Sequence, residues 1–143
     1  MKVTILLADS AQAINGKLYI LGGGWSIADP GPIVMAIAMK IEVPWDQANV
    51  RHRFKLSLLT ADGQPVKVAT PTGDRPLELG NEFEVGRPAG IKRGTPLDLP
   101  IAINLNPIPL PPDGVFVWQL SIDDHSEEDW RLTFATRPAT PHA

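Results

Sequence analysis

The chain has 143 residues, of which 43% are hydrophobic and 20% are charged, and its formal net charge is −3. This length suits one domain with its own apolar core, and the small negative charge provides no global attraction to nucleic acid. Because the chain has no cysteine, disulfides, thiol catalysis and cysteine-ligated metal centres are excluded. Proline accounts for 15 residues spread along the chain, roughly twice its average frequency, so we expect short elements and no long helix.

The first apolar run, in MKVTILLADS, ends at Asp9. It is too short for the core of a signal peptide or for a membrane span. We therefore expect a first strand of a cytoplasmic protein, or of one released without a signal peptide, and no membrane partner. The next signal is Asn15-Gly16 between two apolar segments, which predicts a type I′ hairpin because both central residues of that turn need a positive φ.

Period-two alternation then predicts half-buried strands over five further stretches, namely residues 36–43, 54–59, 97–105, 116–123 and 130–135. In the first of these, Ile37 and Met39 fall on the buried face, and Ala36 and Ala38 fall on the opposite one. Pro100 removes a ladder donor from the third, which predicts an edge strand or a bulge there. The alternation assigns four aromatic residues to the core, which are Phe54, Trp118, Trp130 and Phe134.

The turn residues agree with these strands. Asp62-Gly63 predicts a second hairpin, Asp113-Gly114 leads into the strand that starts at Phe116, and PWDQAN predicts a single helical turn that begins at Pro44. Together they predict an all-β fold, an antiparallel β-sandwich of immunoglobulin-like type with seven to nine strands. An open-ended barrel is the structural alternative. Residues 1–137 form the single domain, and residues 138–143 form a flexible C-terminal tail.

Several phrases carry a resemblance that covers nearly the whole chain: LLADSAQAINGKLYILGGGWS, MAIAMKIEVPW, HRFKLSLLTADGQPV, FEVGRPAGIKRGTPLDLPIAINL and VFVWQLSID. They resemble a small family of functionally uncharacterised proteins found in bacteria and in some phage genomes. That resemblance implies no catalytic motif, cofactor or partner. More loosely, PPDGVFVWQLSIDD resembles the late strand of immunoglobulin-like and fibronectin-like modules, with Phe116 where a tyrosine corner would have tyrosine.

The glycine run in LYILGGGWS is the first candidate site. A phosphate cradle there would need a helix to follow, because it uses backbone N–H groups at a helix N-terminus. The sequence that follows, WSIADPGP, has neither a helical period nor the lysine of a nucleotide-binding loop. We therefore interpret the glycines as a strand end where the backbone bends or passes close to another strand.

The densest polar cluster is DDHSEED, predicted to be the solvated tip of a hairpin. It has no EF-hand pattern and no buried partner, but weak cation binding by its carboxylates stays open, namely by Asp123, Asp124, Glu127 and Asp129. No catalytic residue and no metal ligand is assigned, because the histidines and serines lie outside any nucleophile motif. The histidines are His52, at a strand entrance, His125, in the cluster, and His142, in the tail.

Two further features bear on partners. GRPAGIKRG forms a small basic loop with Arg87, Lys92 and Arg93, either a solvated loop or a contact to phosphate or to an acidic partner. Trp25 and Trp45 both stand beside turns. Each either caps one end of the core or anchors an interface.

These observations predict a protein that works by binding and is not an enzyme. We expect protein contacts through Trp25, Trp45, Arg87, Lys92 and Arg93, with self-association into a homo-oligomer or a larger assembly. If the gene belongs to a phage, the alternative is a virion or capsid-surface component. A small-ligand or carbohydrate-binding sandwich, or an enzyme whose site is not visible in the sequence, is a further alternative.

Overall fold

The computed structural model describes residues 1–139, and the final four residues of the predicted tail lie outside this range. The described chain is all-β and holds fourteen strands and one 3₁₀ turn, η1, at Trp45–Gln47. In chain order the strands are β1 Lys2–Ala8, β2 Ser10–Ile14, β3 Lys17–Leu21, β4 Ile27–Ala28, β5 Gly31–Ile33, β6 Ala36–Val43, β7 His52–Thr60, β8 Lys67–Thr70, β9 Gly73–Pro76, β10 Glu78–Phe83, β11 Leu97–Asn104, β12 Ile108–Leu110, β13 Val115–Ile122 and β14 Arg131–Thr136.

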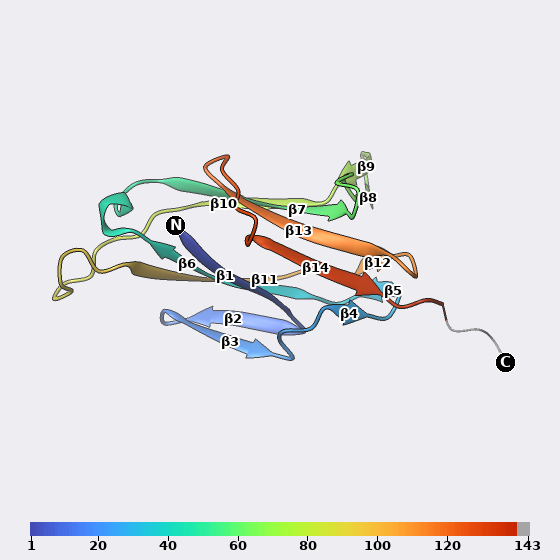
Figure 1. Cartoon of the computed structure of the whole chain (residues 1–143), viewed down its shortest axis with the longest axis horizontal. Helices are drawn as coiled ribbons and strands as arrows, with labels where there is room; N and C mark the ends of the chain where they lie inside the picture. Colours follow the sequence, from blue (N-terminus) through green and yellow to red (C-terminus); the bar gives the residue numbers. More distant parts are fainter. Residues whose placement is uncertain (140–143) are drawn as a thin grey trace.

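Two sheets pack face to face (Figure 1). One has the order β1-β6-β11, and the other has the order β10-β7-β13-β14-β4. All pairs are antiparallel except β14 with the short β4. The inward side chains of both sheets form one buried cluster, which confirms the predicted sandwich. Trp118 and Phe134 are among its largest fully buried members.

Seven strands have six or more residues: β1, β6, β7, β10, β11, β13 and β14. Counted along the chain, the first, second and fifth of these (β1, β6 and β11) share one sheet. The third, fourth, sixth and seventh (β7, β10, β13 and β14) share the other. An immunoglobulin sandwich likewise separates its first, second and fifth strands from its third, sixth and seventh. The predicted count of seven to nine strands therefore describes the long strands. Of the long strands, β10 was not predicted, and of the short strands only those of the Asn15-Gly16 hairpin and the one after Asp62-Gly63 were expected.

The outward face of β6 differs from the prediction. Ala36 and Ala38, assigned to the face opposite the core, are as buried as the core itself. The β2–β3 hairpin causes this, because Ala11 of β2 packs against them and against Ala8 in a second, smaller cluster. Small side chains allow the hairpin to lie close to the sheet. Alternation alone shows the two faces of a strand and not what covers the second one.

The predicted turns are present. Asn15 and Gly16 both have positive φ between β2 and β3, which confirms the type I′ prediction. The chain also reverses at Asp62-Gly63, where the Gly63 N–H donates to the Thr60 carbonyl. The segment after the turn pairs with β7 through the antiparallel Leu59–Pro65 bridge and the Val66 N–H to Leu58 carbonyl hydrogen bond, which confirms a short hairpin. Beyond it, β8 pairs with β9.

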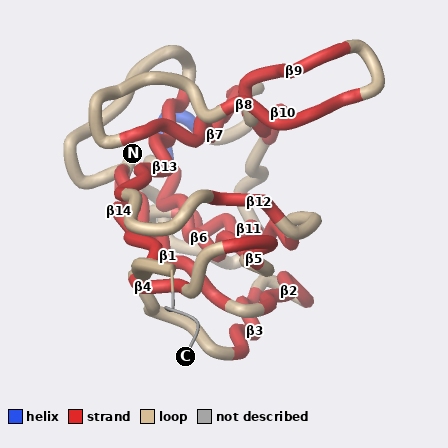
Figure 2. Tube along the Cα trace, turned by 90° about the vertical axis from the view of Figure 1, so that its right-hand side faces the viewer, coloured by secondary structure: helices blue, strands red, loops and turns tan. Residues whose placement is uncertain are grey.

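The two small hairpins lie apart on the molecule. Figure 2 shows the β8–β9 hairpin projecting at the top and the β2–β3 hairpin at the bottom. The strand with Pro100 is β11, which forms an edge of the three-stranded sheet, as its proline predicted. The predicted helical turn is η1, which follows Pro44.

Candidate functional site

The glycine run forms a corner that wraps around Asp9. Gly22 and Gly24 have positive φ, and a side chain on Gly23 would collide with Ile20. The Asp9 N–H donates to the carbonyls of Leu21 and Gly22, and the Gly24 N–H donates to the Leu7 carbonyl at 2.7 Å. The backbone amides of Asp9 and Gly24 are thus used within the protein, which confirms a bend with a close approach of strands.

Trp25, just after this corner, packs into one end of the core. Its ring meets Phe134 edge-on, with the ring centroids 6.3 Å apart, and the side chain contacts the main buried cluster. Its Nε1 atom is buried and has no acceptor among the described residues. Of the two roles considered for Trp25, these contacts favour the cap on the core.

His52 is a site that the sequence analysis missed. The side chain is only 6% exposed and stacks on Phe83. Its Nδ1 atom lies 2.7 Å from the Asp123 carboxylate and its Nε2 atom lies 3.0 Å from the Gln47 carbonyl. The expectation that DDHSEED has no buried partner is therefore wrong. Asp123 is held against β7, because its other carboxylate oxygen accepts from the Arg53 N–H at 2.9 Å.

The charges of this pair reinforce each other. Burial lowers the pKa of His52, but the Gln47 carbonyl and the Asp123 carboxylate together outweigh it, so the pKa lies above its usual value of 6.5. The His52 ring and the Arg53 N–H hold the pKa of Asp123 below its usual range. When the ring is doubly protonated, both of its nitrogens donate hydrogen bonds. His52 thus joins η1 to the turn that follows β13.

Trp45 and Arg87, two of the residues assigned to partner contacts, lie together at the same end. The Arg87 guanidinium stacks over the Trp45 ring, 4.6 Å from its centroid, and donates to the Trp45 carbonyl at 2.6 Å. Beside the ring is a mostly apolar groove of about 670 Å³, lined by Met1, Pro44 and Pro96 among others. An indole beside such a groove with an arginine on its face suits a protein contact.

Lys92 and Arg93 lie on the same loop as Arg87, between β10 and β11, and both are exposed. The Lys92 carbonyl accepts from the Thr95 N–H and hydroxyl, which closes a tight turn. Figure 1 shows this loop at the same end of the sandwich as η1 and shows β4, which follows Trp25, toward the other end. The structure therefore groups four of the five assigned residues and separates Trp25 from them.

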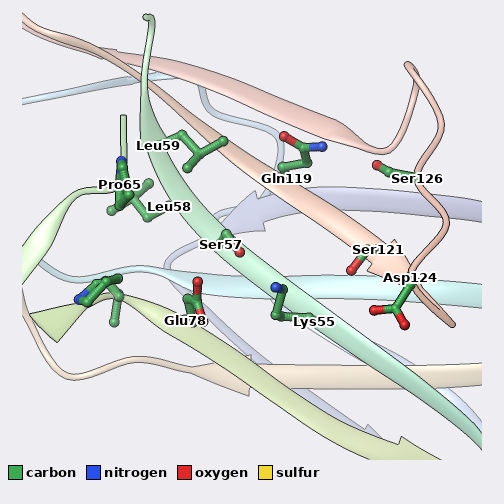
Figure 3. A pocket seen from close by; sticks show the side chains of 12 residues that line it. Lys55, Ser57, Leu58, Leu59, Pro65, Glu78, Gln119, Ser121, Asp124 and Ser126 are labelled. Carbon is green, nitrogen blue, oxygen red and sulfur yellow. The ribbon is translucent and has the colours of Figure 1, made fainter. Parts of the chain in front are cut away.

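The outer face of the five-stranded sheet carries a polar hollow, shown in Figure 3. Its volume is about 310 Å³. Seven polar side chains from β7, β10, β13 and the following turn line it: Lys55, Ser57, Glu78, Gln119, Ser121, Asp124 and Ser126. Pairing in register aligns three of them across the sheet, since Glu78 and Gln119 are both opposite Ser57. The sequence showed Lys55, Ser57, Gln119 and Ser121 only as the polar half of two alternations. It could not group them with Glu78, because residues on different strands meet only after pairing.

The β2–β3 hairpin carries an exposed apolar surface. Four of the nine large hydrophobic side chains that are exposed in the described chain belong to it. They are Ile14, Tyr19, Ile20 and Leu21, and Leu21 reaches 71% exposure. Tyr19 and Leu21 project from the same face of β3, because they are two residues apart on a strand.

The inner edge of this hairpin is pinned by Asn104, at the end of β11. The Ala11 N–H donates to the Asn104 Oδ1 atom at 3.1 Å, and the Asn104 Nδ2 atom donates to the Ala11 carbonyl at 2.8 Å. The amide thus makes both hydrogen bonds that a neighbouring strand would make. The outer strand, β3, pairs with β2 alone among the strands of residues 1–139.

No group of three or more His, Cys, Asp or Glu side chains in residues 1–139 is placed to hold a metal ion. No helix in that range combines the length and apolar character needed to cross a membrane.

The model of the family of unknown function DUF6941 matches residues 3–135, so the chain belongs to that family. No curated protein matches the chain.

Proposed function

We propose that this member of a family without an assigned function is a non-catalytic protein-interaction module whose principal contact is the β2–β3 hairpin. The observation that carries this proposal is the concentration of exposed apolar side chains on one short hairpin. Ile14, Tyr19 and Leu21 share one face of the hairpin, whereas Ile20 is paired with Ala11 on the other face. Scattered exposed hydrophobic residues are normal on a soluble protein, whereas a group on one face marks a contact surface. Tyr19 adds an aromatic side chain, the type that anchors many interfaces.

The free edge of β3 supports the same proposal. A strand edge exposes unpaired N–H and C=O groups, and proteins usually protect such edges with charge, proline or a bulge. Edge strand β10 carries Glu78 and Glu82, whereas β3 carries one lysine at its start and is apolar from Leu18 to Leu21. A partner strand could therefore add to β3 by main-chain hydrogen bonds while its side chains cover Tyr19 and Leu21.

The partner is either another copy of the chain or a component of a larger assembly. A virion component would also need this surface for protein contacts. The gene neighbourhood distinguishes a virion component from a cellular interaction module, since head or tail genes nearby would favour the virion component. The unprotected edge supports protein contact in either case.

Site-specific photo-cross-linking tests the hairpin. A photoreactive residue at Leu21 should give cross-linked protein, in the purified sample or in a lysate of the native source, and Tyr19→Lys in the same chain should abolish it. The matched control places the photoreactive residue at Val115, an exposed apolar position on β13. Equal cross-linking at the two positions would overturn the proposal.

The polar hollow supports a second candidate, the small-ligand or carbohydrate-binding role. Its lining offers donors and acceptors side by side, as sugar hydroxyls require. Lys55, Glu78 and Asp124 make no ion pair within 4.0 Å in the described chain, so their charges remain open to a ligand. Amide NMR spectra recorded with a panel of monosaccharides should show shifts confined to Ser57, Gln119 and Ser121. Lys55→Met should remove these shifts, and a panel that moves no signal would exclude this candidate.

A further inference from the structure

The end of the molecule that carries η1 holds two segments of opposite charge. The basic segment is the loop with Arg87, Lys92 and Arg93, and the acidic segment is the turn with Asp124, Glu128 and Asp129. His52 holds η1 and the acidic turn together, because its ring binds Gln47 of η1 on one side and Asp123 at the start of that turn on the other. The basic loop is tied to the same place, since the Asn49 N–H donates to the Val85 carbonyl at 2.7 Å.

The charges of the two segments are largely unused within one chain. In residues 1–139, Lys92 and Arg93 form no ion pair, nor do Asp124, Glu128 and Asp129. By contrast, neighbouring charges are paired: Lys2 with Glu42, Arg51 and Arg53 with Glu82, and Glu127 with His125. Asp46 and Lys55 also face this end, and they reduce the net charge of each segment without reversing its sign.

An apolar surface accompanies the charges. The groove beside Trp45 is walled by Met1, Pro44 and Pro96. Val50, three residues after η1, and Ile91, in the basic loop, are also exposed, at 48% and 42%. Apolar area with charges around it is the usual anatomy of a protein interface.

We propose that this end is a two-fold interface with a second copy of the chain, in which the basic loop of each protomer faces the acidic turn of its partner. A two-fold contact uses the same patch on both molecules, so a patch that contains both charges is complementary to itself. Each pairing then forms twice, and the apolar groove is covered between them. This interface does not involve the β2–β3 hairpin and stands independently of the proposed function.

A charge-swap experiment tests the interface through the native mass of the purified full chain. One variant combines Lys92→Glu with Arg93→Glu, and a second combines Glu128→Lys with Asp129→Lys. Each variant alone should weaken the dimer at least about tenfold at low salt, because like charges then face each other. An equimolar mixture of the two should restore a dimer, because every pairing in that heterodimer is again between opposite charges.

The matched control combines Lys67→Glu with Arg75→Glu. It changes the net charge by the same amount as Lys92→Glu with Arg93→Glu. Its two positions lie on the β8–β9 hairpin, toward the other end of the sandwich (Figure 1). It should leave the dimer intact, and added salt should weaken the native dimer because screening reduces exposed charge pairs. A native chain that stays monomeric at high concentration, a mixture that fails to restore the dimer, or a control as damaging as the swaps would each overturn the proposal.

Failure of the two-fold interface can be distinguished from failure of the hairpin proposal. If Leu21→Lys abolishes self-association while both charge variants remain dimeric, the copies meet through the hairpin and the two-fold interface is wrong. If the charge swap succeeds while Leu21 cross-links no more than Val115, the hairpin proposal is wrong and the interface stands.

Discussion

Trp25 and Trp45 start from similar sequence surroundings, each beside a turn, yet they occupy different environments. Trp25 is partly buried, packs edge-on against Phe134 and lies against the main core cluster. Trp45 lies at the opposite end, beneath the Arg87 guanidinium and beside an apolar groove. The difference shows that the role of a tryptophan near a turn depends on which residues the tertiary structure places in contact with its ring. Four changes test this comparison.

The largest effect is expected for Trp25→Ala, which should lower the free energy of unfolding by about 3 kcal/mol because it leaves a cavity beside Phe134. Chemical denaturation measures this loss. Trp25→Phe serves as the control and should cost much less, because it keeps an aromatic ring and removes an N–H that has no acceptor in the described chain. Equal losses for the two variants would contradict a packing role.

Next in size is His52→Ala, which should cost about 2 kcal/mol, because it leaves the Gln47 carbonyl and the Asp123 carboxylate without their shared partner. Hydrogen exchange should show that the loss loosens η1 and the turn after β13 together, while β4 and β14 stay protected. Loosening confined to either segment alone would show that His52 does not couple them.

A smaller effect is expected from pH. The raised pKa of His52 means that its contribution to stability is fully present below about pH 6.5 and is lost as the pH rises through the folded-state pKa. The lowered pKa of Asp123 means that its contribution is present above its ordinary value and is lost as the pH falls through the folded-state pKa.

Thermal unfolding scans should therefore show stability declining as the pH rises above about 6.5, and declining again in strong acid. In His52→Gln the decline at higher pH should disappear, because glutamine does not titrate. A variant that keeps the same slope would place the titrating group elsewhere.

The smallest effect on folding is expected for Trp45→Ala, about 1 kcal/mol, because the ring loses mainly its contact with Arg87. Its effect on self-association should be larger, and a native mass measurement compares the two. If Trp45→Ala destabilises the chain as much as Trp25→Ala, the two tryptophans have the same role and the comparison fails.

Much of the core was predictable because it depends on short-range periodicity. Trp118, Trp130, Phe54 and Phe134 are buried where alternation placed them, and the edge position of β11 followed from Pro100. His52 was not predictable in the same way. It occupies the first inward position of β7, but its partners come from residues 5 and 71 positions away.

The candidate surfaces also have one part that the sequence pattern shows and another part that depends on contacts between distant residues. Arg87, Lys92 and Arg93 were recognisable as a basic loop, because neighbours in sequence share a charge. That this loop lies at the end that also holds η1 and the acidic turn depends on the pairing of β7 with β10 and β13. The polar hollow likewise depends on strand register, which no single segment encodes.

By itself, the sequence determined the all-β class, every long strand except β10, the inward face of the five alternating strands and the hairpin at Asn15-Gly16, because backbone sterics and alternation act between neighbouring residues. Only the tertiary structure decided that Ala36 and Ala38 are covered, that Asn104 pins the β2–β3 hairpin and that Trp25 and Trp45 lie apart. These depend on contacts between residues far apart in the chain, whose formation is set by packing of the whole domain.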